Sequence, residues 1–166
     1  MFKQLVLSAV LLAIPTTLLA QPQTGAAPAG PQARQPAPAL TADQQAEIRK
    51  QDATMAQAAL QVAQLVDQGH AGEVWDGASG AAKQVVQRDA FVKQVDADRR
   101  QVGRPLSRKL AGITRRGSKG GATPAGYYIN VSFATQFANE KQPVRELVSF
   151  HLDQDKVWRV SGYTLR

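Results

Sequence analysis

Residues 127–137 read YYINVSFATQF, and large apolar side chains alternate with smaller or polar ones along this stretch. One side of the alternation comprises Tyr127, Ile129, Val131, Phe133 and Phe137. Successive side chains of a β-strand point to opposite faces of the sheet. The period of two therefore predicts a strand with one apolar face that packs against a core.

Two more strands are predicted after this one. Residues 144–152 place Val144, Val148, Phe150 and Leu152 in alternation with Arg145, Ser149 and His151. Residues 157–165 carry Val157, Trp158, Val160, Tyr163 and Leu165, and Ser161-Gly162 is a candidate β-bulge. Short polar turns at 138–142 and 153–156 separate the runs, which favours an antiparallel meander.

The upstream half of the chain has helical periodicity. We expect helices over 42–68, 70–79 and 89–102, then a strand over 106–113 and a loop over 115–125. Thr41 and Gln44 have the spacing of a capping box, and Gly69 fits a helix end. The predicted fold class is α+β, with N-terminal helices packed on a curved four-stranded antiparallel sheet.

The N-terminal region predicts export. Residues 1–20 combine Lys3 with a short apolar run that ends in Ala20, which is typical of a secretory signal peptide cleaved after Ala20. Gln21 stands where an acylated cysteine would be needed, so no lipid anchor is expected. Residues 21–40 are rich in Pro and Ala and predict a disordered linker. We therefore expect a folded domain over 41–166 in a periplasmic or secreted protein.

Positive charge is concentrated in one segment of this chain of net charge +7. Eight of its twenty Lys and Arg residues lie between positions 99 and 119, and no acidic residue occurs from 99 to 139. Such a surface attracts anionic polymers with an affinity that falls as salt rises. The candidate polyanion-binding residues are Arg99, Arg100, Arg104, Arg108, Lys109, Arg115, Arg116 and Lys119. The alternative interpretation is a solvated basic edge without a partner.

Several short motifs resemble the DUF4019 family of uncharacterised exported bacterial proteins. They include Val66-Asp67-Gln68-Gly69-His70, Glu73-Val74-Trp75, Ala78-Ser79, Tyr127-Tyr128 and the closing segment from Trp158 to Tyr163. The likeness covers about residues 58–166 and rests on the order and spacing of the motifs. It implies an NTF2-like, cone-shaped α+β fold, and it supplies no catalytic residues.

Few catalytic chemistries are compatible with the composition. There is no cysteine, and the two histidines, His70 and His151, lack metal-ligand spacing, so no metal and no cofactor is expected. No nucleophile motif surrounds Ser79. The remaining enzymatic hypothesis is an acid–base site in an apolar pocket, for which the candidates are Asp67, His70 and Asp76.

The functional hypothesis is a non-catalytic ligand-binding or protein-interaction module. Candidate pocket residues are Trp75, Phe133, Trp158 and Tyr163, although aromatic residues within helices and strands are more often core residues. The alternatives are a binder of envelope lipid, lipopolysaccharide or cell-wall polymer, and an NTF2-like isomerase, dehydratase or hydrolase. The partner would be an envelope protein or an anionic envelope polymer, and the signal peptide argues against nucleic acid. A homodimer could form through the other sheet face, which carries Tyr128, Ala134 and Leu147.

Overall fold

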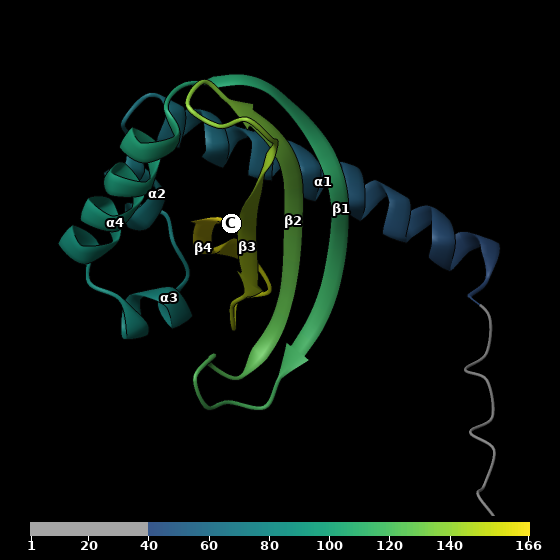
Figure 1. Ribbon diagram of the computed structural model, residues 1–166. Coiled ribbons are helices and arrows are strands. Elements are labelled where there is room, and N and C mark those ends of the chain that lie inside the picture. Colours follow the sequence, from purple (N-terminus) through teal and green to yellow (C-terminus); the bar gives the residue numbers. More distant parts are fainter. Residues whose placement is uncertain (1–39) are drawn as a thin grey trace, which may run out of the picture. The chain divides into compact units, whose positions relative to one another are not determined.

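The computed structural model describes residues 40–166, so the predicted signal peptide and nearly all of the predicted linker lie outside the described residues. Helices precede strands, and the predicted α+β class is confirmed (Figure 1). The elements are α1 (Ala42–Asp67), α2 (Ala71–Asp76), α3 (Gly80–Val85), α4 (Arg88–Val102), β1 (Pro105–Ser118), β2 (Gly126–Phe137), β3 (Val144–Leu152) and β4 (Trp158–Leu165).

The four strands form one antiparallel sheet in the order β1-β2-β3-β4, as the meander predicted. The bulge in β4 is confirmed. Ser149 lies opposite Gly162 and Phe150 lies opposite Val160, which leaves Ser161 as the extra residue. The first strand is longer than the predicted 106–113, because residues 115–118 continue to pair with β2. The predicted loop over 115–125 was therefore wrong in its first part.

Local capping fixes the helix boundaries. The predicted capping box of α1 is present: Thr41 N–H donates to Gln44 Oε1 at 2.9 Å, and Gln44 N–H donates to Thr41 Oγ1 at 3.2 Å. The predicted helix over 70–79 ends earlier, and Ser79 begins a separate helix by accepting from Ala82 N–H at 3.1 Å. Among residues 40–166, no helix has both the length and the apolar character that crossing a membrane requires.

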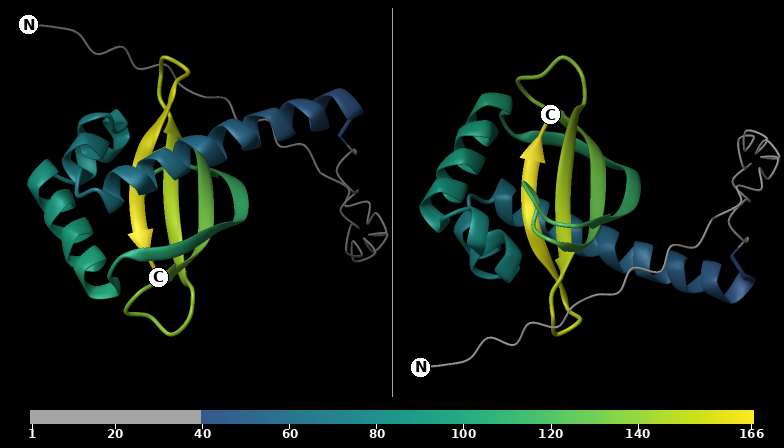
Figure 2. Two further views of the ribbon diagram at one scale, coloured as in Figure 1. Left: turned by 90° about the horizontal axis from the view of Figure 1, so that it is seen from above. Right: turned by 90° about the horizontal axis from the view of Figure 1, so that it is seen from below.

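The core lies between the helices and one face of the sheet. Figure 2 shows α1 crossing this face, with α2, α3 and α4 gathered beside β4. Ile129, Val131 and Phe133 of β2 are at most 5% exposed, as their alternation predicted. Tyr127 departs from the prediction: it is 68% exposed, because it lies opposite Gly117 next to the β1–β2 turn, at the edge of the core.

Gly103 connects α4 to β1, and its backbone conformation requires glycine. Its φ of 79° and ψ of −165° belong to a region that side chains rarely adopt, and an added Cβ would lie 2.9 Å from Asn139 Cγ. We expect Gly103→Ala to lower the free energy of unfolding by about 1–3 kcal/mol, measured by urea denaturation. Gly80→Ala is the matched control, because a Cβ there meets nothing within 4 Å, and it should be neutral or slightly stabilising. Equal effects of the two changes would contradict this account.

Candidate functional site

A buried carboxylate lies on the apolar face of the sheet. Glu146 of β3 is 0% exposed, and its neighbours on the same face of the strand include the core residue Val148. Its Oε1 accepts from the Tyr163 hydroxyl at 2.7 Å, and its Oε2 accepts from the Thr135 hydroxyl at 2.6 Å. Arg108 forms a bidentate ion pair with Glu146, in which Arg108 Nε lies 2.5 Å from Glu146 Oε2 and Arg108 Nη2 lies 3.1 Å from Glu146 Oε1. Glu146 is therefore fully hydrogen-bonded although it is buried.

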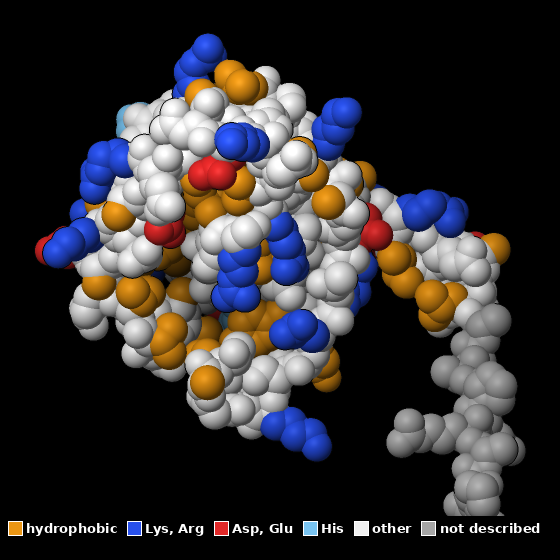
Figure 3. Space-filling model, viewed as in Figure 1, with side chains coloured by type: hydrophobic (Ala, Val, Ile, Leu, Met, Phe, Trp, Pro, Cys, Tyr) orange, Lys and Arg blue, Asp and Glu red, His pale blue; other side chains and the backbone are white. Residues whose placement is uncertain are grey.

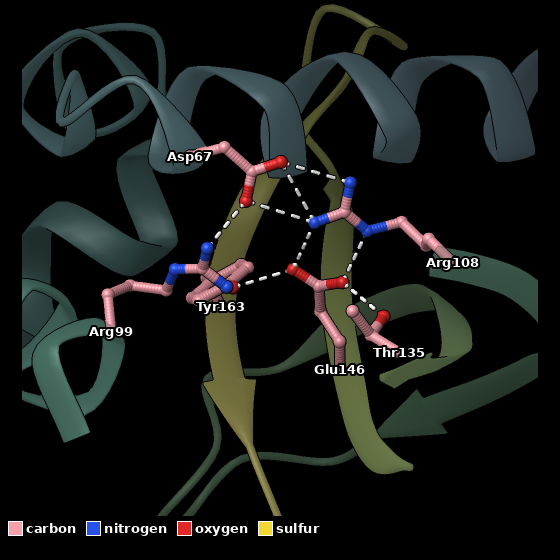
Figure 4. Close-up of polar contacts among 6 residues, drawn as sticks. All are labelled: Asp67, Arg99, Arg108, Thr135, Glu146 and Tyr163. Carbon is pink, nitrogen blue, oxygen red and sulfur yellow. Dashed lines mark hydrogen bonds and ion pairs between the residues drawn. The ribbon is translucent and has the colours of Figure 1, made fainter. Parts of the chain in front are cut away.

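A second carboxylate completes the buried charge network, which comprises Asp67, Arg99, Arg108, Thr135, Glu146 and Tyr163 (Figure 4). Asp67, the last residue of α1, accepts from both terminal nitrogens of Arg108 at 3.1 Å. Arg99 of α4 donates to Asp67 Oδ1 at 2.8 Å and lies over the Phe137 ring, 4.6 Å from its centroid. Two carboxylates thus balance two guanidinium groups, which is the arrangement that buried charges require.

The network holds its groups in fixed protonation states. Burial alone would raise the pKa of Glu146, but the hydrogen bonds from Arg108, Thr135 and Tyr163 outweigh it and lower that pKa. Burial, together with the Glu146 charge, raises the pKa of the Tyr163 phenol well above its ordinary value. Glu146 therefore stays ionised and Tyr163 stays a hydrogen-bond donor over the ordinary pH range.

The six network residues come from six different elements. Asp67 belongs to α1, Arg99 to α4 and Arg108 to β1, and the sheet's three other strands supply Thr135, Glu146 and Tyr163. Their contacts join segments as far apart in the sequence as Asp67 and Arg108. The network can therefore fix the position of α1 and α4 on the sheet.

A cavity of about 320 Å³, which we call the mouth cavity, opens between α1 and the sheet. Gln51 of α1 borders it, sixteen residues before Asp67 and hence roughly 24 Å away along the helix. Arg115 of β1 donates to Gln51 Oε1 and Asp52 Oδ1 at 2.8 and 2.7 Å, so an ion pair bridges helix and sheet at this edge. The lining residues that offer apolar surface are Tyr127, Tyr128, Ile129, Leu152 and Trp158.

A family model described as "Protein of unknown function (DUF4019)" matches residues 58–163, which is more than half of the chain. The chain belongs to the DUF4019 family. All six residues of the buried charge network lie inside the matched segment, as does Trp158. Searches of curated proteins and of solved structures found no match to this chain.

The DUF4019 domain does not bring the three acid–base candidates together. Asp67 is paired with two arginines in the network. His70 is half-exposed, with Nδ1 3.4 Å from Glu73, and Asp76 pairs with Arg88 at 2.9 Å on the surface. Each candidate thus has a different charged partner, and none of the three lines the mouth cavity.

The four candidate pocket residues have different roles in the DUF4019 domain. Phe133 and Tyr163 are buried in the hydrophobic core. Trp75 donates its indole N–H to the Val86 carbonyl at 3.3 Å, a contact that fastens α2 to the end of α3. Trp158 lines the mouth cavity, so it alone of the four has the position that a ligand contact needs.

The basic segment does not form one surface. Arg99 and Arg108 have side chains only 11% exposed and are paired in the network, and Arg115 is paired with Asp52. These three residues correct the predicted polyanion-binding set. The exposed members that form no ion pair among the described residues are Arg100, Arg104, Lys109, Arg116 and Lys119.

Sequence reasoning missed Glu146 and Thr135. A signal for Glu146 was present, because it occupies an apolar-face position between Val144 and Val148 in the alternating run. A charged residue at such a position indicates a buried ion pair. The partner could not be named, since Arg108 lies 38 residues away. Among residues 40–166, no group of His, Asp and Glu side chains could hold a metal ion.

Removing the Glu146 charge should destabilise the protein. Glu146→Gln keeps the shape of the side chain but leaves the two arginines with one carboxylate, and the expected loss is about 3–5 kcal/mol in the free energy of unfolding. Asp76→Asn, which breaks an exposed pair, is the control and should change stability little. Chemical denaturation measures both, and a near-neutral Glu146→Gln would contradict the importance of the network.

Because of the network, the free energy of unfolding should decrease at acid pH. The pKa of Glu146 lies below its ordinary value of 4.5 in the folded protein, so its stabilisation is complete above that pH and is lost as the pH falls through the folded pKa. Urea denaturation from about pH 6 to about pH 3 should show stability falling below pH 4.5. The fall should be shallower in Glu146→Gln, and identical slopes would count against this assignment.

Proposed function

We propose that this protein is a non-catalytic binding module whose ligand occupies the mouth cavity. The observation that carries the proposal is an apolar cavity beside Trp158 and Tyr127, with Tyr127 itself 68% exposed. Exposed aromatic surface that borders a cavity is typical of ligand sites. Arg115 and Arg116 also border the cavity, so its ligand is a small amphipathic molecule with an apolar body and an anionic or polar end.

The charge network favours binding over acid–base catalysis. A general acid or base works best with a pKa near the working pH. The pKa of Glu146 is lowered and that of Tyr163 is raised, so both move away from neutrality. Neither residue lines the mouth cavity. The network therefore supports a structural role, which is to hold the helices that frame the ligand.

The proposal also covers where the protein resides in the cell and which α+β fold family it adopts. An exported bacterial protein, carried to the periplasm by residues 1–20, is the setting we propose for this module. An NTF2-like arrangement is supported by helices that cover one face of a four-stranded antiparallel sheet. Binding of anionic polymers through residues 99–119 is disfavoured as the main function, because the three arginines paired above are not available for it.

An amphipathic fluorescent probe tests the mouth cavity. The probe 8-anilinonaphthalene-1-sulfonate has aromatic rings for Trp158 and a sulfonate for the arginines, and it should bind the native protein. Tyr127→Ala should weaken binding about fivefold, since about 1 kcal/mol of aromatic contact is lost. Val85→Ala is the matched control, because Val85 is 62% exposed and does not line the cavity.

The two tryptophans provide a second readout. Energy transfer to the bound probe should fall more in Trp158→Phe than in Trp75→Phe, because Trp158 lines the cavity and Trp75 does not. A probe that binds the Tyr127→Ala variant as tightly as it binds the native protein, or that accepts energy only from Trp75, would place the ligand elsewhere and refute the proposal.

A further inference from the structure

A second cavity, which we call the outer cavity, lies on the face of the sheet opposite the helices. It measures about 530 Å³, and all four strands contribute to it. Three arginines line it: Arg116 of β1, Arg145 of β3, and Arg166, which follows β4. Figure 3 shows Lys and Arg side chains gathered around a hollow between the end of β4 and the β1–β2 turn. The outer cavity therefore has a cationic rim.

No acidic side chain offsets the positive charge of the three guanidinium groups in this rim. Within residues 40–166, none of the three arginines forms an ion pair, and no residue that lines the outer cavity is acidic. Residues 1–39 contain no Asp or Glu, so they cannot supply a carboxylate. The lack of an acidic side-chain partner among the described residues distinguishes these three guanidinium groups from those of the buried charge network.

Two of the arginines are direct cross-strand partners. Arg145 N–H donates to the Arg166 carbonyl at 2.8 Å, and Arg166 N–H donates to the Arg145 carbonyl at 2.9 Å. Like charges directly opposite each other destabilise a sheet. Within residues 40–166, the only side-chain hydrogen bonds of the Arg145 guanidinium join it to Ser132 Oγ at 3.3 Å. An anion between the arginines would remove this repulsion.

Buried hydroxyl groups line the same cavity. Ser161 Oγ and Thr164 Oγ1 are shielded from solvent and have no hydrogen-bond partner among the described residues. Buried polar atoms normally have a hydrogen-bond partner. Two buried hydroxyl groups without one, in the same cavity, therefore indicate a ligand or ordered water. Ser161 is the extra residue of the β4 bulge, and bulges commonly redirect a side chain next to a functional site.

We propose that the outer cavity binds a phosphate group. Phosphate offers several acceptor oxygens and a charge of up to two, which suits three guanidinium groups and two hydroxyls better than the two oxygens of a carboxylate do. The cavity has room for the organic part of a phosphate ester or a lipid headgroup. The outer cavity shares Arg116, Gly117 and Tyr128 with the mouth cavity, but Arg145, Arg166, Ser161 and Thr164 line the outer cavity and not the mouth cavity, so tests at these four residues do not depend on the proposed function.

Calorimetric titration with inorganic phosphate and pyrophosphate tests the site. Both anions should bind the native protein, and Arg145→Gln should weaken binding about tenfold, the effect of losing a charge-assisted hydrogen bond. Arg100→Gln removes the same charge from an exposed position outside the cavity and should change affinity less than about twofold. Arg166→Gln serves as a second variant should Arg145→Gln not fold, because Arg166 lines the outer cavity and not the mouth cavity.

The Ser161→Ala and Thr164→Val variants distinguish a specific phosphate site from non-specific attraction of the anion to positive charge. Both keep the net charge, and each should weaken phosphate binding several-fold. No binding by the native protein would overturn the proposal. Equal losses in Arg145→Gln and Arg100→Gln, or full affinity in both hydroxyl variants, would overturn it as well, since they would indicate non-specific electrostatics.

Vesicle binding distinguishes the source of the phosphate group. Retention on phosphatidylglycerol vesicles that is lost in Arg145→Gln, kept in Arg100→Gln and competed by pyrophosphate would identify a lipid headgroup. Binding of free phosphate without retention on phosphatidylglycerol or phosphatidylcholine vesicles would identify a soluble phosphate ester. Retention that depends equally on both arginines would contradict a role for the outer cavity in either case.

Discussion

Burial of the Glu146 carboxylate constrains the whole domain, because removing a charge from water costs several kcal/mol unless the charge is paired and hydrogen-bonded. Three neighbouring strands supply its donors, and the most important is Arg108. The terminal nitrogens of Arg108 in turn need a second carboxylate as hydrogen-bond acceptor, and Asp67 at the end of α1 provides it. The electrostatic demands of one side chain thus specify where the sheet and the first helix meet.

This constraint applies at one end of α1 and weakens toward the other. Around Asp67 the polar contacts are buried, and they join α1 to both α4 and β1. Near Gln51, Arg115 bridges the sheet to α1 by hydrogen bonds to Gln51 and an ion pair with Asp52, and the side chains of Arg115 and Asp52 are about one-third exposed. Exposed pairs contribute little to stability. A helix held firmly at its C-terminal end and loosely at the mouth leaves space over the sheet, and there the apolar cavity lies.

Arginines have three different environments in this protein. Arg99 and Arg108 are paired with buried carboxylates, and Arg115 and Arg159 form exposed pairs. Arg145 and Arg166 face each other, and neither guanidinium group has an acidic side-chain partner among residues 40–166. The sequence shows only that basic residues are abundant between 99 and 119. Strand pairing decides which face of the sheet each of these side chains joins. A register shift between Leu110 and Gly112 of β1 leaves one extra residue, so Arg108 points into the core whereas Arg116, an even number of residues later, points toward the outer cavity.

The amino-acid sequence by itself determined the antiparallel meander, the capping box of α1, the bulge at Ser161 and the apolar face that carries Val131 and Val148, because each depends on the spacing of residues close together in the chain. Tertiary structure alone decided the pairing of Glu146 with Arg108 and Asp67, the exposure of Tyr127, and the selection of Trp158 for the mouth cavity. These features depend on which elements approach one another across dozens of residues. Local periodicity in the sequence carries no information about contacts between residues that far apart in the chain.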